Sequence, residues 1–124
     1  MSESFRRFVL DQLSQVAPRV RGKRMFGGLG IYSGEFFFAL VAGETLYLKV
    51  DDQNRPLFEA LGSKPFQPFP DKPMTMSYYD VPLEALETVT RLKPLAESAI
   101  RAAQDAAVYK AESRKRKAEK RRRQ

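Results

Sequence analysis

The chain has 124 residues, of which 43% are hydrophobic, so its length and composition suit one domain with a real core. It contains no Cys and no His, which excludes disulfides, Cys/His zinc sites and catalysis through a thiolate or an imidazole. The absence of Cys fits a reducing compartment, so we expect a cytoplasmic protein. No stretch reaches about 18 uncharged apolar residues, and we expect no membrane-spanning segment.

The net charge of +7 is concentrated at the C-terminal end. Residues 110–124 hold nine basic and two acidic residues, which leaves 13 of the 22 basic and 13 of the 15 acidic residues in 1–109. We therefore predict a neutral domain over 1–109 and a basic tail over 110–124, either a frayed helix or disordered, because like charges repel. The basic residues of the tail are Lys110, Arg114, Lys115, Arg116, Lys117, Lys120, Arg121, Arg122 and Arg123.

Residues 2–16 carry apolar side chains at helical spacing, and Pro18 ends the expected helix. The next segment, Arg19–Arg24, has four basic residues in six. It is either a solvated connector or a loop that contacts phosphate, and the pattern favours the connector.

Three apolar runs follow, Met25–Tyr32, Glu35–Val41 and Thr45–Val50, separated by short gaps that contain Gly or Asp. Such runs predict an antiparallel β-meander. In the third run, strict alternation places Leu46, Leu48 and Val50 on the side that packs on helices, with Thr45, Tyr47 and Lys49 opposite. The second run is apolar on both sides, which indicates a central strand.

Gly27, Gly28 and Gly30 lie within the first run. They are either strand bulges or a phosphate-binding loop. The bulge is favoured, because more strand follows instead of the helix N-terminus that a phosphate loop needs.

A short helix is expected over Gln53–Leu61, with Asp51 or Asp52 as its cap; the two acids could also hold Mg²⁺, but capping is favoured. A further strand is expected over Met74–Tyr79, in which Tyr78 and Tyr79 are either a stacking platform or one core and one rim residue.

Asp80 is expected to cap a helix that begins near Pro82. We expect Pro94 to break this helix and a new one to run over Leu95–Tyr109. The elements together predict an α+β fold of two layers, with one antiparallel sheet and helices mainly on one face.

Several consecutive motifs resemble the TfoX N-terminal domain family. They are RMFGGLGIY at 24–32, FALV at 38–41, LYLKVD at 46–51, GSKPF at 62–66 and MSYYDVP at 76–82. The resemblance covers roughly residues 8–107. It implies an α-β(3)-α-β(2)-α order and relatedness to regulators of bacterial competence and gene expression. Full-length members carry a second, helical domain, and we expect the short basic tail to stand in its place here.

The hypothesis that follows is a small regulatory or interaction domain without enzymatic activity, cofactor or metal, which binds a protein partner or forms a homodimer. Its expected interaction surface comprises Arg19, Arg21, Lys23, Arg24, Tyr47, Lys49 and Tyr79. The alternative is nucleic-acid binding through the nine basic residues of the tail, which would be non-specific because nothing in the tail reads base edges. The tail could also act only as a solubilising segment.

A third and less favoured alternative is an enzyme that uses Lys49, Tyr47, Glu35 or Asp51. No spacing in the sequence brings these four side chains together.

Overall fold

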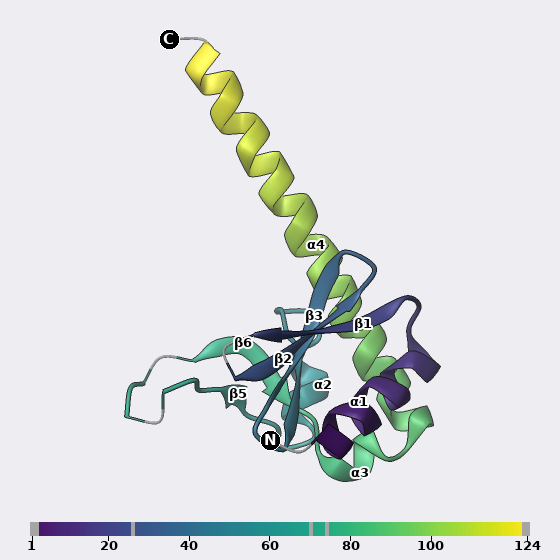
Figure 1. Cartoon of the computed structure of the whole chain (residues 1–124). Coiled ribbons are helices and arrows are strands. Elements are labelled where there is room, and N and C mark those ends of the chain that lie inside the picture. The colour runs from purple at the N-terminus through teal and green to yellow at the C-terminus, as the bar shows by residue number, and fades with distance from the viewer. Residues whose placement is uncertain (1–2, 26, 70, 74, 123–124) are drawn as a thin grey trace.

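The computed structural model describes residues 3–25, 27–69, 71–73 and 75–122. The elements are α1 (Glu3–Val16), β1 (Val20–Met25), β2 (Gly28–Ser33), β3 (Phe36–Ala42), β4 (Thr45–Lys49), α2 (Arg55–Glu59), β5 (Pro65–Phe66), β6 (Met76–Asp80), α3 (Leu83–Leu86) and α4 (Val89–Arg122). The six strands form one antiparallel sheet in the order β1-β2-β3-β4-β6-β5. The predicted α+β class is confirmed, with α1 and the first half of α4 packed against the sheet (Figure 1).

The alternation in the third apolar run places its residues as predicted. Leu46, Leu48 and Val50 are buried in the core, where they meet α1 and α4. Tyr47 and Lys49 lie on the opposite side, which we call the open face of the sheet. Strand β3 is central, as its apolar character on both sides indicates.

Arg19–Arg24 is not a connector, because Val20–Met25 forms the edge strand β1, paired antiparallel with β2. The sequence did not predict this strand, because most of its side chains are exposed. A strand at the sheet edge can therefore lack the apolar alternation that marks a half-buried strand. Its basic side chains also oppose pairing with another sheet, since charge on an edge strand is a common protection against aggregation. The order therefore has four strands before α2, one more than the resemblance implies.

The predicted glycine bulges are wrong in position. The register shifts between Ile31 and Tyr32 of β2. Gly27 instead lies in the β1–β2 turn at φ +76°. Gly28 lies so close to β3 that an added Cβ would stand 2.6 Å from the carbonyl oxygen of Val41. The glycines thus serve a tight turn and a close strand approach.

Two expectations about the C-terminal helices are also wrong. Asp80 does not cap α3; it ends β6, and its carboxylate accepts a hydrogen bond from the backbone N–H of Lys64 at 2.6 Å. Pro94 does not break the helix, because it lies inside α4. The buried side chains of Leu92 and Leu95 on either side of Pro94 pack into the core, which compensates for the lost backbone hydrogen bond.

A polar cluster fastens α4 to the end of β4. The buried amide of Asn54 donates to the Lys49 carbonyl (3.0 Å) and to Ser98 Oγ (3.1 Å), and it accepts from the Asp51 N–H (2.7 Å). Asp51 accepts hydrogen bonds from the backbone N–H groups of residues 53 and 54, so it organises the turn before α2, while Asn54 is the N-cap residue. Arg101 of α4 binds both carboxylate oxygens of Asp51 at 3.1 and 3.0 Å. These contacts fix the point at which α4 passes the sheet.

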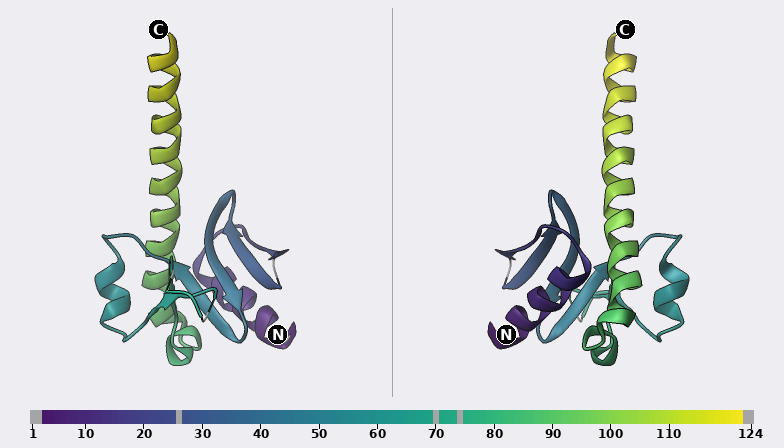
Figure 2. Two further views of the ribbon diagram at one scale, coloured as in Figure 1. Left: turned by 90° about the vertical axis from the view of Figure 1, so that its left-hand side faces the viewer. Right: turned by 90° about the vertical axis from the view of Figure 1, so that its right-hand side faces the viewer.

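Beyond this point α4 leaves the domain. Its last buried residue is Ala103, and the helix continues to Arg122 as a straight rod that stands away from the other elements (Figure 2). At a rise of about 1.5 Å per residue, the projecting part is roughly 28 Å long. In the described part of the chain, no helix is both long and apolar enough to span a bilayer.

Candidate nucleic-acid interface

The projecting part of α4 has a defined charged side. In the first half of the helix, the buried positions are Leu92, Leu95, Ala96, Ala99, Ala102 and Ala103. Eighteen residues are about five turns at roughly 3.6 residues per turn, so the positions eighteen residues further on have the same direction. These positions are Lys110, Ser113, Arg114, Lys117, Lys120 and Arg121.

The side of α4 that packs on the domain therefore continues beyond it as a cationic surface. We call Lys110, Arg114, Lys117, Lys120 and Arg121 the basic face. Successive cations at spacings of three or four residues lie on one stripe of a helix.

The other tail cations lie on different sides of the helix. Arg116 is 3.9 Å from Glu112, in a solvent-exposed ion pair that contributes little energy. Lys115 and Arg122 are exposed. Arg123 lies outside the described residues. The division of the chain into 1–109 and 110–124 stays a prediction, and the helix is continuous across it.

A row of contacting side chains crosses the open face of the sheet. The guanidinium carbon of Arg21 lies 4.4 Å from the ring centroid of Tyr32, and the Tyr32 and Phe37 centroids are 5.1 Å apart. Phe37 meets Tyr78 edge-on at 5.8 Å, and the Lys49 ammonium lies 5.1 Å from the Tyr78 centroid. We call these five residues the aromatic row; Arg21 stands at its β1 end, and Lys49 lies on β4, between the strands of Phe37 and Tyr78.

The strand register explains why the row forms. Arg21 pairs with Tyr32, Tyr32 with Phe37, and Lys49 with Tyr78. Directly opposed residues in antiparallel strands point to the same side of the sheet. Five strands therefore contribute one residue each to a single line on the open face.

The aromatic row and the basic face lie at the same end of the domain. The row lies near the β2–β3 hairpin, which rises beside the projecting part of α4 (Figure 2). Burial lowers the pKa of Lys49, and the charge of Lys110 lowers it further. The first cation of the basic face is thus near enough to Lys49 to repel it, and a bound anion would relieve this repulsion.

Burial and electrostatics differ along the row. Tyr78 is 9% exposed, and its burial, followed by the proximity of Tyr32, raises its pKa to about 12. Tyr32, Phe37 and Lys49 are half-buried, and Arg21 is exposed. The row is therefore a set of packed, partly exposed rings accompanied by two cations.

The residues predicted as an interaction surface fall into two groups. Arg21, Lys23, Tyr47 and Lys49 share the open face, where Tyr47 also packs on the Phe66 ring at 4.7 Å between centroids. The remaining three residues, Arg19, Arg24 and Tyr79, do not.

Arg24 points to the helix side, where it binds Glu3 of α1. Arg19 precedes β1, and its guanidinium lies against Gly34. Tyr79 pairs with Leu48 and packs against the core, 6.3 Å from the Phe58 ring centroid.

The sequence interpretation missed Tyr32 and Phe37, and it placed Tyr79 in the interaction surface, whereas Tyr78 is the tyrosine that lies on the open face. The signal for Tyr32 and Phe37 was present, since both lie in predicted strands. The assignment of Tyr78 required the β4–β6 register, which pairs it with Lys49.

The four side chains considered for an enzyme are not brought together. Tyr47 and Lys49 lie on the open face, Asp51 binds Arg101 of α4, and Glu35 lies in the β2–β3 turn. Burial and the charge of Asp80 raise the pKa of Tyr47, which is not the direction that would make it a base. Among the residues that the structure describes, no three His, Cys, Asp or Glu side chains gather as metal ligands do.

A model of the TfoX N-terminal domain matches residues 11–103, which is more than half of the chain. The chain belongs to the TfoX N-terminal domain family. A comparison with curated proteins gave no match. The matched segment of this TfoX N-terminal domain includes the whole aromatic row and ends at Ala103, the last buried residue of α4. The basic face lies outside the match.

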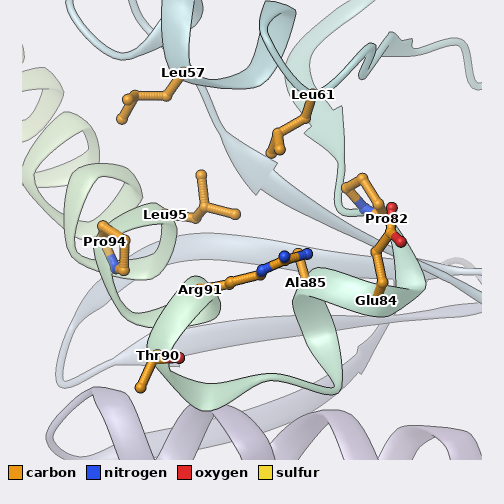
Figure 3. Close-up of a pocket in the computed structure, with 9 residues that line it drawn as sticks. All are labelled: Leu57, Leu61, Pro82, Glu84, Ala85, Thr90, Arg91, Pro94 and Leu95. Atoms are coloured by element: carbon orange, nitrogen blue, oxygen red, sulfur yellow. The ribbon is translucent and has the colours of Figure 1, made fainter.

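The helix side of the TfoX N-terminal domain carries a separate shallow groove of about 440 Å³ between α2, α3 and the start of α4. Leu57 of α2 and Leu61 just after it face Leu95 and Pro94 of α4 across it, and the Arg91 side chain extends toward Ala85 (Figure 3). Its lining is mainly apolar. Nothing in the structure indicates what would cover this groove.

Proposed function

We propose that this chain is a non-enzymatic regulatory domain that binds nucleic acid through the basic face of α4. The observation that carries the proposal is that five cations of a projecting helix share one side. Charges placed only to keep a tail soluble have no need of a common direction. Membership of a family whose full-length members resemble regulators of gene expression supports the same conclusion.

The physical basis is counterion release. Lys and Arg side chains that neutralise phosphates free condensed cations from the nucleic acid, and this drives binding at low salt. The basic face offers no amide or carboxylate that reads bases in a groove, so we expect little sequence preference from it. From Lys110 to Lys120, successive cations of the face lie roughly 5 Å apart along the helix axis, at about 1.5 Å per residue, and Arg121 follows directly.

The test compares two variants of the whole chain that have equal charge and composition. One replaces Arg114, Lys117 and Arg121 of the basic face with Gln, and the control replaces Lys115, Arg116 and Arg122. Each removes two Arg and one Lys, and Gln keeps helix propensity nearly unchanged.

Binding to a labelled DNA duplex is measured by fluorescence anisotropy at a fixed, moderate salt concentration. The basic-face variant should bind about tenfold more weakly than the control, because each lost phosphate contact removes nearly one released counterion. Equal affinity of the two variants would contradict a directional interface. No binding by the wild type at low salt would contradict the proposed function itself.

A further inference from the structure

We propose that the aromatic row of the open face binds the bases of a single-stranded nucleic acid whose phosphates the basic face of α4 holds. This inference rests on the proposed function and names the form of nucleic acid. The basic face alone would accept duplex and single strand alike, since both present phosphates. The aromatic row adds a surface that only unpaired bases can reach.

The chemistry of the row and the basic face matches that of a single-stranded nucleic acid. Proteins that bind single strands combine a cationic path for the backbone with aromatic side chains on which bases stack. The row supplies the rings of Tyr32 and Phe37, both half-buried, with Tyr78 packed beside them. Arg21 on β1 and Lys49 on β4 supply positive charge, and the Arg21 guanidinium is a plane that can itself stack on a base.

In the part of the chain that the structure describes, no acidic side chain neutralises the cations of the row and no helix covers the open face. Among the described residues, no carboxylate forms an ion pair with Arg21 or Lys49. Arg21 Nε donates one hydrogen bond to the carbonyl oxygen of Gly34 (3.3 Å), which leaves its charge unneutralised. The helices pack on the other side of the sheet and leave the open face uncovered. Glu35 in the β2–β3 turn is the one acid of that hairpin, and it is exposed.

The row and the basic face lie at the same end of the domain. The row lies at the end of the sheet where α4 leaves the domain, and Lys110 is close enough to Lys49 to lower its pKa after the effect of burial. A nucleic-acid strand that runs along the basic face would therefore pass near Lys49 of the row. Bases turned toward the sheet would meet Phe37 and Tyr32.

The test uses an oligodeoxynucleotide of about 20 nucleotides, both single-stranded and as a duplex, with the whole chain. The double variant Tyr32→Leu/Phe37→Leu should lose about tenfold or more in single-strand affinity, as expected when stacking partners are removed, and less than about twofold in duplex affinity. The control Phe8→Leu removes an exposed ring from α1, on the helix side, and should change neither affinity. Circular dichroism establishes that each variant is folded.

A second measurement uses a variant that keeps the ring. The chain has no Trp, so its emission comes from five Tyr residues, and a base stacked on Tyr32 should quench part of it. The variant Tyr32→Phe should keep single-strand affinity within about twofold and show a smaller quench on binding.

The outcomes separate the two proposals. Suppose that the wild type binds the duplex. The inference about the row is then overturned, and the proposed role of the basic face is retained, if the double variant keeps full single-strand affinity. The same holds if Tyr32→Phe leaves the fluorescence quench unchanged. Equal losses on both forms would also overturn it, because the row would then not read unpaired bases. If light scattering shows a dimer that the double variant abolishes, a second copy covers the face and the inference is again overturned.

Discussion

The polar cluster around Asn54 is expected to hold α4 in place, and the substitution Asn54→Ala tests this. The side chain is 2% exposed and makes three hydrogen bonds of 2.7, 3.0 and 3.1 Å. Two of these satisfy the backbone N–H of Asp51 and the backbone carbonyl of Lys49. An unsatisfied buried polar group costs about 1–3 kcal/mol, so we expect a loss of about 2–4 kcal/mol in the free energy of unfolding.

The assay is urea denaturation followed by far-ultraviolet circular dichroism, with the slope of the transition used to verify two-state behaviour. Ser98→Ala is the control, because it removes only one of the three bonds of Asn54, together with the hydrogen bond that the Ser98 hydroxyl donates to the Leu95 carbonyl, and should cost about 1 kcal/mol. The double variant should cost less than the sum of the two, since the side chains share a contact. A change of less than about 0.5 kcal/mol for Asn54→Ala would refute the reasoning, because it would mean that water replaces all three bonds.

Three further predictions concern Arg101, Gly28 and Tyr78. Hydrogen bonds from Arg101 are the main cause of the lowered pKa of Asp51. The stabilisation of the folded state by this pair is therefore fully present above the ordinary carboxyl pKa of about 4. It is lost as the pH falls through the lowered pKa of the folded state. Arg101→Gln should therefore flatten the decline of stability measured by urea denaturation below about pH 4, and an unchanged profile would contradict the role of this pair. Gly28→Ala should destabilise the fold by about 2 kcal/mol or more, because the added Cβ would meet the backbone oxygen of Val41. Gly27→Ala has open space around it and should cost about 1 kcal/mol, for the positive φ alone. Melting temperatures measure the two variants, and equal values would contradict this prediction. The pKa of Tyr78, about 12, exceeds the value near 10 of an unfolded tyrosine. An absorbance titration should therefore show one phenolate forming only near pH 12, and Tyr78→Phe should remove this transition. The free energy of unfolding should fall as the pH rises above about 10.

The sequence predicted the parts of the fold whose apolar pattern is strong. Alternation over Thr45–Val50 placed Leu46 and Leu48 in the core, where the structure has them. Strand β1 was missed because its exposed basic residues, such as Lys23, give no apolar period. The continuity of α4 through Pro94 depends on tertiary packing, which a local rule about proline does not include.

The candidate interface was predicted in charge but not in direction. The count of basic residues after Tyr109 was plain, whereas the common side of Lys110 and Arg121 follows only when α4 is one helix from Val89 onward. The aromatic row joins Tyr32 and Phe37 to a residue more than forty positions later in the sequence. Its assembly required the strand order and register, which the sequence pattern did not supply.

The central claim is that the projecting part of α4 binds nucleic acid through phosphates. The most direct measurement is the salt dependence of duplex binding by the wild type and by the variant that replaces Arg114, Lys117 and Arg121 with Gln. If roughly five to seven cations engage, the slope of log K against log salt should be about −5 to −6 for the wild type. The variant should be shallower by roughly 2.7, since each phosphate contact contributes about 0.9. A wild-type slope shallower than about −2, or an equal slope for the variant, would contradict the claim.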